Sequence, residues 1–283
     1  TMDGAKTVIA SYKTQYYLTL TVPSYAIPSG GGWYDSGSTA TFSVVSPISV
    51  GTGIRYVFIG WTGDYTGTSP SGSITMDGAK TVIASYKTQY YLAVVGGGSA
   101  TGQGWYDEGS TATVSSSYVW GTAAGQSRYS LVSWQIDTTV NPVNRVSSGT
   151  FITPTIYMNT YHTVAFNSIV QYYLSVSGGN NIAYTPISPT SDNWYDTGTT
   201  VTVATDYVWG STGQFRYSLV SWLLDGVSKP VVRASSGIFT TLPLSMSTYR
   251  SITFVAVTQY YLSINAPSYA GATGQGWYDS GSR

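Results

Sequence analysis

The chain has 283 residues and carries 12 basic and 12 acidic side chains, so its formal net charge is zero at pH 7. Charged residues make up 8% of the chain, against about 25% in an average soluble protein, and the absence of a basic run argues against a nucleic-acid partner. The lack of cysteine excludes disulfides, thiolate metal sites and cysteine nucleophiles. Apolar residues make up 42%, so we expect a folded chain, and no apolar run approaches the ~20 residues that a membrane helix needs.

Internal repetition organises the sequence. Residues 1–18 recur letter for letter as residues 75–92, and Gln-Tyr-Tyr-Leu begins at Gln15, Gln89, Gln171 and Gln259. Because each such repeat is a folding unit, we predict repeat one at 15–88, repeat two at 89–170 and repeat three at 171–258. Residues 1–14 are then the terminal strand of a preceding repeat and residues 259–283 the opening strands of a following one. We therefore expect the chain to be a window on a longer protein.

In chain order, strands are predicted at residues 15–22, 38–45 and 55–61, and Asp77-Gly78 predicts a hairpin turn. Residues 81–92 alternate between a more apolar and a more polar face, and they cross the border of repeat one without Gly or Pro. This pattern predicts a stiff joint rather than a linker. No segment has a capped 3.6-residue period. The expected fold is all-β, a tandem array of small β-sandwich or β-grasp-like domains joined by continuous strands, with little or no helix.

Two motifs recur. The first is Trp-Tyr-Asp-x-Gly, and the second is an Arg followed six residues later by Trp and nine residues later by Asp. Their residues in the three repeats are Trp33, Asp35, Arg55, Trp61 and Asp64; Trp105, Asp107, Arg128, Trp134 and Asp137; and Trp194, Asp196, Arg216, Trp222 and Asp225. Since residues six apart share a face of a strand, each Arg is expected to stack on the Trp of its own strand. The Asp residues are assigned to turns and to an Arg–Asp brace.

Catalytic and metal roles for these carboxylates are the alternatives, as an acid–base pair or a calcium cage. Both are disfavoured, because a catalytic site is needed once whereas these residues recur in every repeat. The lone His162 aligns with Lys80 and Arg250, and no nucleophile elbow is present. We therefore assign no catalytic, metal or cofactor-binding residue, expect no cofactor, and predict that the chain is not an enzyme.

Paired aromatic residues distinguish repeats two and three, at Tyr118 and Trp120 and at Tyr207 and Trp209. Exposed in coplanar pairs, they would form a platform for glycans. Buried, they would supply core or inter-domain contacts, which is the favoured interpretation because large aromatics provide most of the buried area in small β domains. Solvent accessibility of the two tryptophans separates these readings.

One stretch of repeat one resembles a known family. Phe-Ile-Gly-Trp-Thr-Gly-Asp at residues 58–64, followed by Ile-Thr-Met-Asp-Gly-Ala-Lys-Thr-Val-Ile-Ala at 74–84, is similar to the divergent internalin-type B-repeat, a Listeria–Bacteroides-like surface repeat. Repeats two and three keep the tryptophan but lose the flanking glycines and the Met-Asp-Gly step. The resemblance implies a small β-rich module of extracellular adhesins and stalks, without catalytic residues.

The expected function is structural, as a mechanical spacer in an extracellular stalk, fibre or adhesin at the cell surface. A surface rich in Ser, Thr and Tyr with a single Glu fits that location. Expected partners are further repeats of the same chain or identical chains in a fibre, including strand donation by residues 1–13, with surface glycans or host and neighbour cells as further partners. The alternatives are a glycan-binding module and a non-catalytic appendage of a secreted hydrolase.

Overall fold

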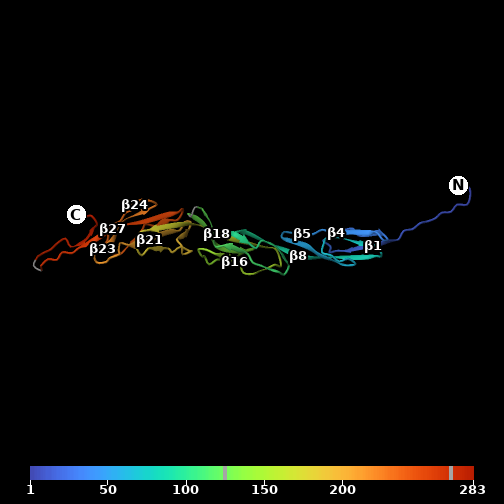
Figure 1. The fold of residues 1–283 in the computed structure, drawn as a ribbon, viewed down its shortest axis with the longest axis horizontal. Coiled ribbons are helices and arrows are strands. Elements are labelled where there is room, and N and C mark those ends of the chain that lie inside the picture. The colour runs from blue at the N-terminus through green and yellow to red at the C-terminus, as the bar shows by residue number, and fades with distance from the viewer. Residues whose placement is uncertain (124–125, 268–269) are drawn as a thin grey trace. The chain divides into compact units, whose positions relative to one another are not determined.

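The computed structural model describes residues 1–123, 126–267 and 270–283. Small parts of predicted repeat two and of the following repeat thus lie outside the described residues. Within these ranges all regular structure is β-strand and no helix occurs, which confirms the all-β class (Figure 1). Accordingly, no described segment forms a helix that could cross a membrane.

The contacts group the chain into two compact units. The first contains Thr1–Val94, Thr101–Val114 and Thr153–Val164, and the second contains Val95–Ala100, Ser115–Ile152 and Ala165–Arg283. The border between the units runs through predicted repeat two. The domain borders at 15–88, 89–170 and 171–258 therefore stay a prediction.

Predicted repeat one contains two sheets. Its strands are β1 (Gln15–Thr21), β2 (Pro28–Ser29), β3 (Gly32–Asp35), β4 (Thr39–Val44), β5 (Ile48–Gly51), β6 (Ile54–Gly63), β7 (Ser71–Thr75) and β8 (Lys80–Gly96). β1, β3, β5, β6 and β8 belong to one sheet, and β2, β4 and β7 form another. Strands β1, β4 and β6 lie where the alternation of apolar and polar residues predicts strands.

The core of this repeat is built by side chains from both sheets. Leu18 of β1, Phe42 of β4, Trp61 of β6 and Val82 of β8 are buried together, with Met76 beside them. Buried residues alternate with more exposed ones along β4 and at the start of β8, since successive side chains of a strand face opposite sides. Side chains from both sheets thus share one core.

The Asp77-Gly78 hairpin prediction is wrong. β7 pairs with β4, whereas β8 pairs with β6 and, in parallel, with β1. Gly78 is absent from the positions with positive φ. Strand partners distant in sequence, rather than the local Asp-Gly signal, determine the path of the chain here.

The two identical copies of the duplicated segment adopt different structures. Residues 75–92 lead into β8, where Met76 and Val82 are fully buried. Residues 1–14, predicted to be a terminal strand, form no strand, and Met2 and Val8 are exposed (Figure 1). The second copy is a strand because β1 and β6 supply partners for it, which shows that tertiary pairing decides the conformation of this sequence.

The remaining strands repeat the same plan. They are β9 (Gly98–Thr101), β10 (Gly104–Asp107), β11 (Thr111–Ala112), β12 (Ser115–Ser117), β13 (Val119–Ala123), β14 (Ser127–Ile136), β15 (Thr139–Pro142), β16 (Thr150–Ile152), β17 (Ile156–Tyr157), β18 (His162–Ser177), β19 (Ala183–Thr185), β20 (Trp194–Asp196), β21 (Thr200–Asp206), β22 (Val208–Trp209), β23 (Phe215–Leu224), β24 (Val227–Pro230), β25 (Ile238–Thr240), β26 (Leu244–Ser245), β27 (Arg250–Leu262) and β28 (Gly276–Asp279). β18 pairs antiparallel with β20 and parallel with β27, as β1 does with β3 and β8.

Three long strands, β8, β18 and β27, each run through a predicted repeat border without interruption (Figure 1). β8 pairs with β6 from Val82 to Tyr90 and with β10 from Gln89 to Leu92. Gln89 and Tyr90 therefore belong to both ladders. The ladders of β27 with β23 and with β28 share Gln259 and Tyr260 in the same way.

Candidate functional site: the joints between predicted repeats

Each shared stretch carries a row of polar side chains across three neighbouring strands. At the first, Arg55 of β6 lies opposite Gln89 of β8, and Gln89 lies opposite Asp107 of β10. Directly opposed residues project from the same face of a sheet. With the tryptophan two positions before each Asp, the rows define joint 1 (Arg55, Gln89, Asp107, Trp105), joint 2 (Arg128, Gln171, Asp196, Trp194) and joint 3 (Arg216, Gln259, Asp279, Trp277).

The glutamine links the other two polar side chains in every joint. The arginine Nε donates to the glutamine Oε1 at 2.8 Å in joint 1, 2.9 Å in joint 2 and 2.8 Å in joint 3. The glutamine Nε2 then donates to the aspartate Oδ1 at 2.7, 3.1 and 2.9 Å. Both ends of the amide are thus used, and the row fixes the lateral register of three strands.

The arginine of each joint also covers the tryptophan. The guanidinium carbon lies 4.3 Å from the ring centre of Trp105, 4.6 Å from that of Trp194 and 4.6 Å from that of Trp277. The tryptophan is two residues before the aspartate and so projects from the same face of its strand. A cation stacked on indole contributes about 0.5–2 kcal/mol, depending on its desolvation.

The prediction that each Arg stacks on the Trp of its own strand is therefore wrong. A bulge lies between Phe58 and Gly60, so that Ile59 is an extra residue and the later side chains change face. Trp61 consequently turns into the core on the side of Phe58, away from Arg55. Trp134 and Trp222 are buried likewise, and a bulge between Leu219 and Ser221 interrupts β23.

The Arg–Asp brace within one motif is also corrected. Asp64 accepts a hydrogen bond from the backbone N–H of Thr81, and Asp225 accepts one from that of Ser251 and pairs with Arg250. Asp137 and Asp225 have positive φ in the turns after β14 and β23. These aspartates secure turns against the neighbouring strand, and other aspartates take part in the joints.

The aspartate of each joint also forms an ion pair with a basic side chain outside the row. This partner is a lysine in joint 1 and an arginine in joints 2 and 3. In joint 1, Lys87, two residues before Gln89, pairs with Asp107, and near the start of predicted repeat one Lys13 pairs with Asp35 in the same way. Repeats two and three have Ile169 and Val257 at that position.

In their place, Arg145 pairs with Asp196 and Arg233 with Asp279, each through two hydrogen bonds. Each of these arginines also donates to a serine two residues after the joint arginine, Ser130 or Ser218. Sequence reasoning missed these contacts and the linking glutamine. The signal was the loss of the lysine together with the appearance of an arginine before Ser-Ser-Gly.

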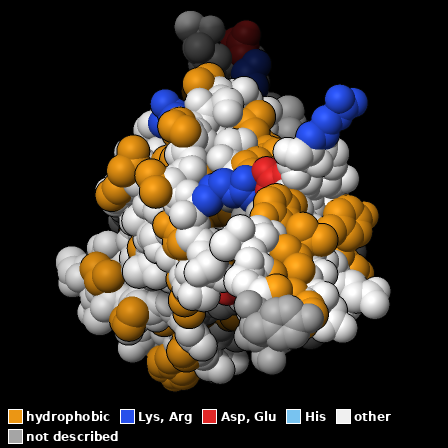
Figure 2. Space-filling view, turned by 90° about the vertical axis from the view of Figure 1, so that its left-hand side faces the viewer, with side chains coloured by type: hydrophobic (Ala, Val, Ile, Leu, Met, Phe, Trp, Pro, Cys, Tyr) orange, Lys and Arg blue, Asp and Glu red, His pale blue; other side chains and the backbone are white. Residues whose placement is uncertain are grey.

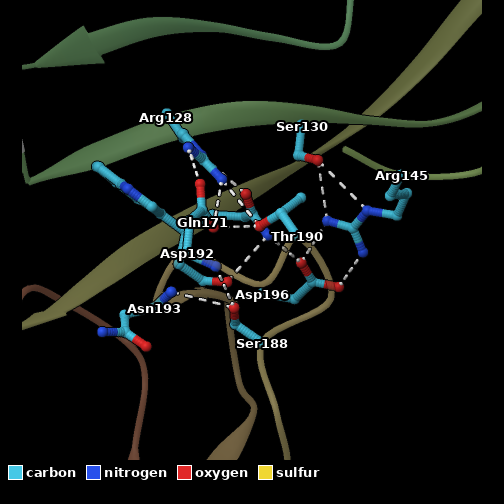
Figure 3. Close-up of polar contacts among 10 residues, drawn as sticks. Arg128, Ser130, Arg145, Gln171, Ser188, Thr190, Asp192, Asn193 and Asp196 are labelled. Atoms are coloured by element: carbon cyan, nitrogen blue, oxygen red, sulfur yellow. Dashed lines mark hydrogen bonds and ion pairs between the residues drawn. The ribbon is translucent and has the colours of Figure 1, made fainter. Parts of the chain in front are cut away.

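Joint 2 is the most buried of the three (Figure 3). The Arg128 side chain is 6% exposed and pairs with Asp192 at 2.8 Å. It also donates to Thr190 at 2.9 Å, and Asp192 accepts a hydrogen bond from the same threonine. Figure 3 shows Arg128, from β14, and Arg145, from the segment between β15 and β16, both directed toward the residues before and in β20. Because all these partners are charged or polar and enclosed, the removal of one leaves the others without compensation.

Hydrogen-bonded ion pairs lower the pKa values of three of these carboxyls, Asp35, Asp107 and Asp279. A hydrogen bond from Lys87, with another from Gln89, holds the pKa of Asp107 below its ordinary value. Lys13 and Gln15 lower the pKa of Asp35 in the same way. Hydrogen bonds from Arg233 and Gln259 lower the pKa of Asp279 to about 2.

We expect Asp279 to titrate near pH 2 in the folded chain, below the ordinary carboxyl value of about 3.9. Because the folded-state pKa is the lower one, ionised Asp279 stabilises the fold above the ordinary value, and this contribution is lost as the pH falls through about 2. Carboxyl carbon NMR measures the pKa. Arg233→Gln should move it toward the ordinary value, whereas Lys229→Gln should not. An unshifted pKa in the unmodified chain would contradict the ion pair.

Trp33 occupies the corresponding position near the start of predicted repeat one but lies differently. Gln15 Nε2 donates to Asp35 Oδ1 at 2.7 Å, as in the joints. The Trp33 ring contacts Tyr17 edge to face at 5.2 Å, yet its side chain is 67% exposed. Half of a joint is therefore present at this end of repeat one.

The four aromatic residues proposed for glycan or inter-domain contact are half-buried, and each packs on a ring of its own predicted repeat. Tyr118 contacts Phe151, Trp120 stacks on Tyr129, Tyr207 contacts Phe239 and Trp209 contacts Tyr217. Trp120 also lies so close over Gly98 that a Cβ there would meet the ring at 2.5 Å. The two tryptophans are thus neither fully exposed, as a glycan platform would need, nor fully buried.

The surface is poor in charge. Figure 2 shows one face on which hydrophobic side chains are dispersed among uncharged polar atoms, with few lysine, arginine or acidic side chains. Across residues 1–123, 126–267 and 270–283, no three His, Asp or Glu side chains gather as metal ligands would. The joints are thus the most elaborate polar clusters of the described chain.

No protein-family model, curated protein or solved structure matches the chain.

Proposed function

We propose that the chain is a mechanical segment of an extracellular stalk, fibre or adhesin shaft, made of tandem small β-sandwich domains and without catalysis. One observation carries this proposal, namely that two ladders of β8 overlap at the border after predicted repeat one, and two ladders of β27 overlap at the border after predicted repeat three. Residues of these two borders are paired with a strand on each side, so bending there would strain both ladders. Neighbouring units that share a strand extend the array by a regular step.

The joints support the same proposal. Each adds an Arg–Gln–Asp row and an arginine–tryptophan stack at the place where two predicted repeats meet. Their recurrence favours a structural device, since a catalytic site is needed once. The likeness of residues 58–64 and 74–84 to internalin-type B-repeats fits a cell-surface location, as does the low charge of the chain. The proposed partners are further repeats of the same kind, in one chain or in identical chains of a fibre.

Small-angle X-ray scattering on the whole chain tests the proposal. We take each predicted repeat to be as long as the ten-residue strand β6, which is about 33 Å. Three such repeats joined end to end would make a rod with a radius of gyration of roughly 30 Å. A compact chain of this length has a radius of gyration of about 19 Å. We expect the larger value, and a value near the smaller one would exclude a stiff spacer.

A matched pair of insertions separates stiffness from length. Gly-Gly-Ser inserted after Thr88 interrupts β8 where its two ladders meet, so the scattering should become that of a hinged rod. The same tripeptide inserted after Gly226, in the exposed turn between β23 and β24, should leave the scattering unchanged. Equal flexibility in both variants would mean that the shared strand does not set the stiffness.

A further inference from the structure

Trp33 is exposed, whereas the tryptophans of the three joints each lie under an arginine side chain. Trp105, Trp194 and Trp277 are half-buried, each beneath the guanidinium of an arginine. Trp33 is 67% exposed, although its strand β3 pairs with β1 in the register of β10 with β8. Trp33 contacts Tyr17, which is 44% exposed, so two aromatic rings are exposed together at this place.

The polar half of the site is already formed. Gln15 Nε2 donates to Asp35, which also pairs with Lys13. Because the amide nitrogen of Gln15 is bound to Asp35, its Oε1 points away from β3. In joint 1 the corresponding oxygen of Gln89 accepts the hydrogen bond of the arginine Nε. Within the described ranges no hydrogen-bond donor lies on Gln15 Oε1. The site thus offers a flat aromatic face beside an oriented acceptor.

We propose that the Trp33 face, formed by Gln15, Trp33 and Asp35, docks an arginine-bearing β-strand of another repeat of this type. The guanidinium stacks on Trp33 while its Nε donates to Gln15 Oε1. An arginine satisfies both features at once, because its planar group stacks on an aromatic ring and its N–H groups project in a fixed fork. The inference rests on the proposed spacer function, since it extends the same joint to one more repeat.

The three joints identify this occupant rather than a sugar or an unrelated protein. Each presents the same tryptophan, glutamine and aspartate, and in each an arginine occupies the same place within 0.3 Å of the same ring distance, 4.3 to 4.6 Å. The tyrosine after each arginine is also constant, at Tyr56, Tyr129 and Tyr217. The Trp33 face therefore has the same residues, in the same register, as the surface that binds an arginine in each joint.

The duplicated sequence allows a direct test. A copy of residues 15–74 placed before Thr1 runs into residues 1–18, which equal residues 75–92, so the added segment reproduces repeat one without a mismatch. Acrylamide quenching of tryptophan fluorescence, compared with that of the Trp33→Phe variant, isolates the Trp33 signal. Trp33 is 67% exposed, whereas its arginine-covered counterparts are half-buried, so we expect the Trp33 quenching constant to fall about twofold when an arginine stacks on it.

Replacing the arginine copied from Arg55 by alanine in the added segment should restore the quenching of Trp33. Arg55→Ala in the unextended chain is the matched control and should raise the quenching of Trp105 by a similar factor. Unchanged quenching of Trp33 next to a folded added segment would overturn the inference. An added segment that stays unfolded would also overturn it, because this sequence folds as repeat one when a joint follows it. Protection of Trp33 by maltohexaose, with none from the added repeat, would assign the face to glycans instead.

Scattering from the extended chain separates this inference from the proposed function. If Trp33 is protected but the chain scatters as a flexible one, the docking inference holds and the stiff-spacer function is excluded. A stiff rod with an unprotected Trp33 would do the reverse.

Discussion

Replacing Trp61 by alanine is expected to lower the free energy of unfolding of repeat one by about 3–5 kcal/mol, the usual loss for a large aromatic side chain removed from a core. The Trp61 side chain is 2% exposed and packs on Phe42 and Phe58, with ring centres 5.0 and 5.2 Å away. Its Nε1 donates to the carbonyl of Ser69 at 2.9 Å. The substitution therefore removes both packing and a partner of a loop carbonyl.

Trp33→Ala is the control, because it deletes the same side chain from an exposed position. We expect a loss within about 0.5 kcal/mol there. Urea unfolding followed by amide hydrogen exchange of β4 and β6 measures both variants locally, which matters because a chain of several units need not unfold in one step. Similar losses for the two variants would show that Trp61 does not anchor the core.

Arg128→Ala is expected to lower stability by about 3 kcal/mol, because it leaves enclosed charged and polar groups without their partner. The Arg128 side chain is 6% exposed, and that of its ion-pair partner Asp192 is 25% exposed, which places the loss at the lower end for buried pairs. Gln171, which is fully buried, would also lose the donor to its Oε1.

Arg55→Ala provides the comparison within the same chain. Arg55 is half-buried and contacts Gln89 and Trp105 without an aspartate of its own, so we expect a loss of about 1 kcal/mol. Arg128→Lys should recover only part of the stability, since an ammonium group lacks the planar fork. Thermal unfolding and hydrogen exchange at β14 and β18 measure the effect. Equal losses at Arg55 and Arg128 would contradict the role of Asp192 and Thr190.

The strands were predictable because alternation of apolar and polar residues is a local signal. This signal predicted strands at β1, β4 and β6, and it predicted that β8 continues past the end of predicted repeat one. The partner of Arg55 was not predictable in this way. A single extra residue, Ile59, reverses the face of Trp61, and nothing in the alternation of this short strand marks the bulge.

The joints show a second limit. Gln89 was visible as part of a repeated tetrapeptide, but its role depends on which strands lie on each side of β8, and that is a property of the sheet. Arg145 and Arg233 replace a lysine that is absent from β18 and β27 and reach the aspartate from a loop distant in sequence. Only the coincidence of the two changes, read across repeats, indicates that one substitution compensates for the other.

The parallel pairing of β1 with β8 also determines how predicted repeat one would respond to a pull along the chain. A load on the chain would pull β1 from its N-terminal end, near Gln15, and β8 toward its C-terminal end. The two strands lie side by side in parallel, with Leu18 opposite Lys80 and Thr21 opposite Ile83. Opposite pulls on parallel neighbours slide them past one another, so the hydrogen bonds between them are strained together rather than opened one after another. β18 and β27 repeat this arrangement, so a pull along the chain would load predicted repeats one and three in shear.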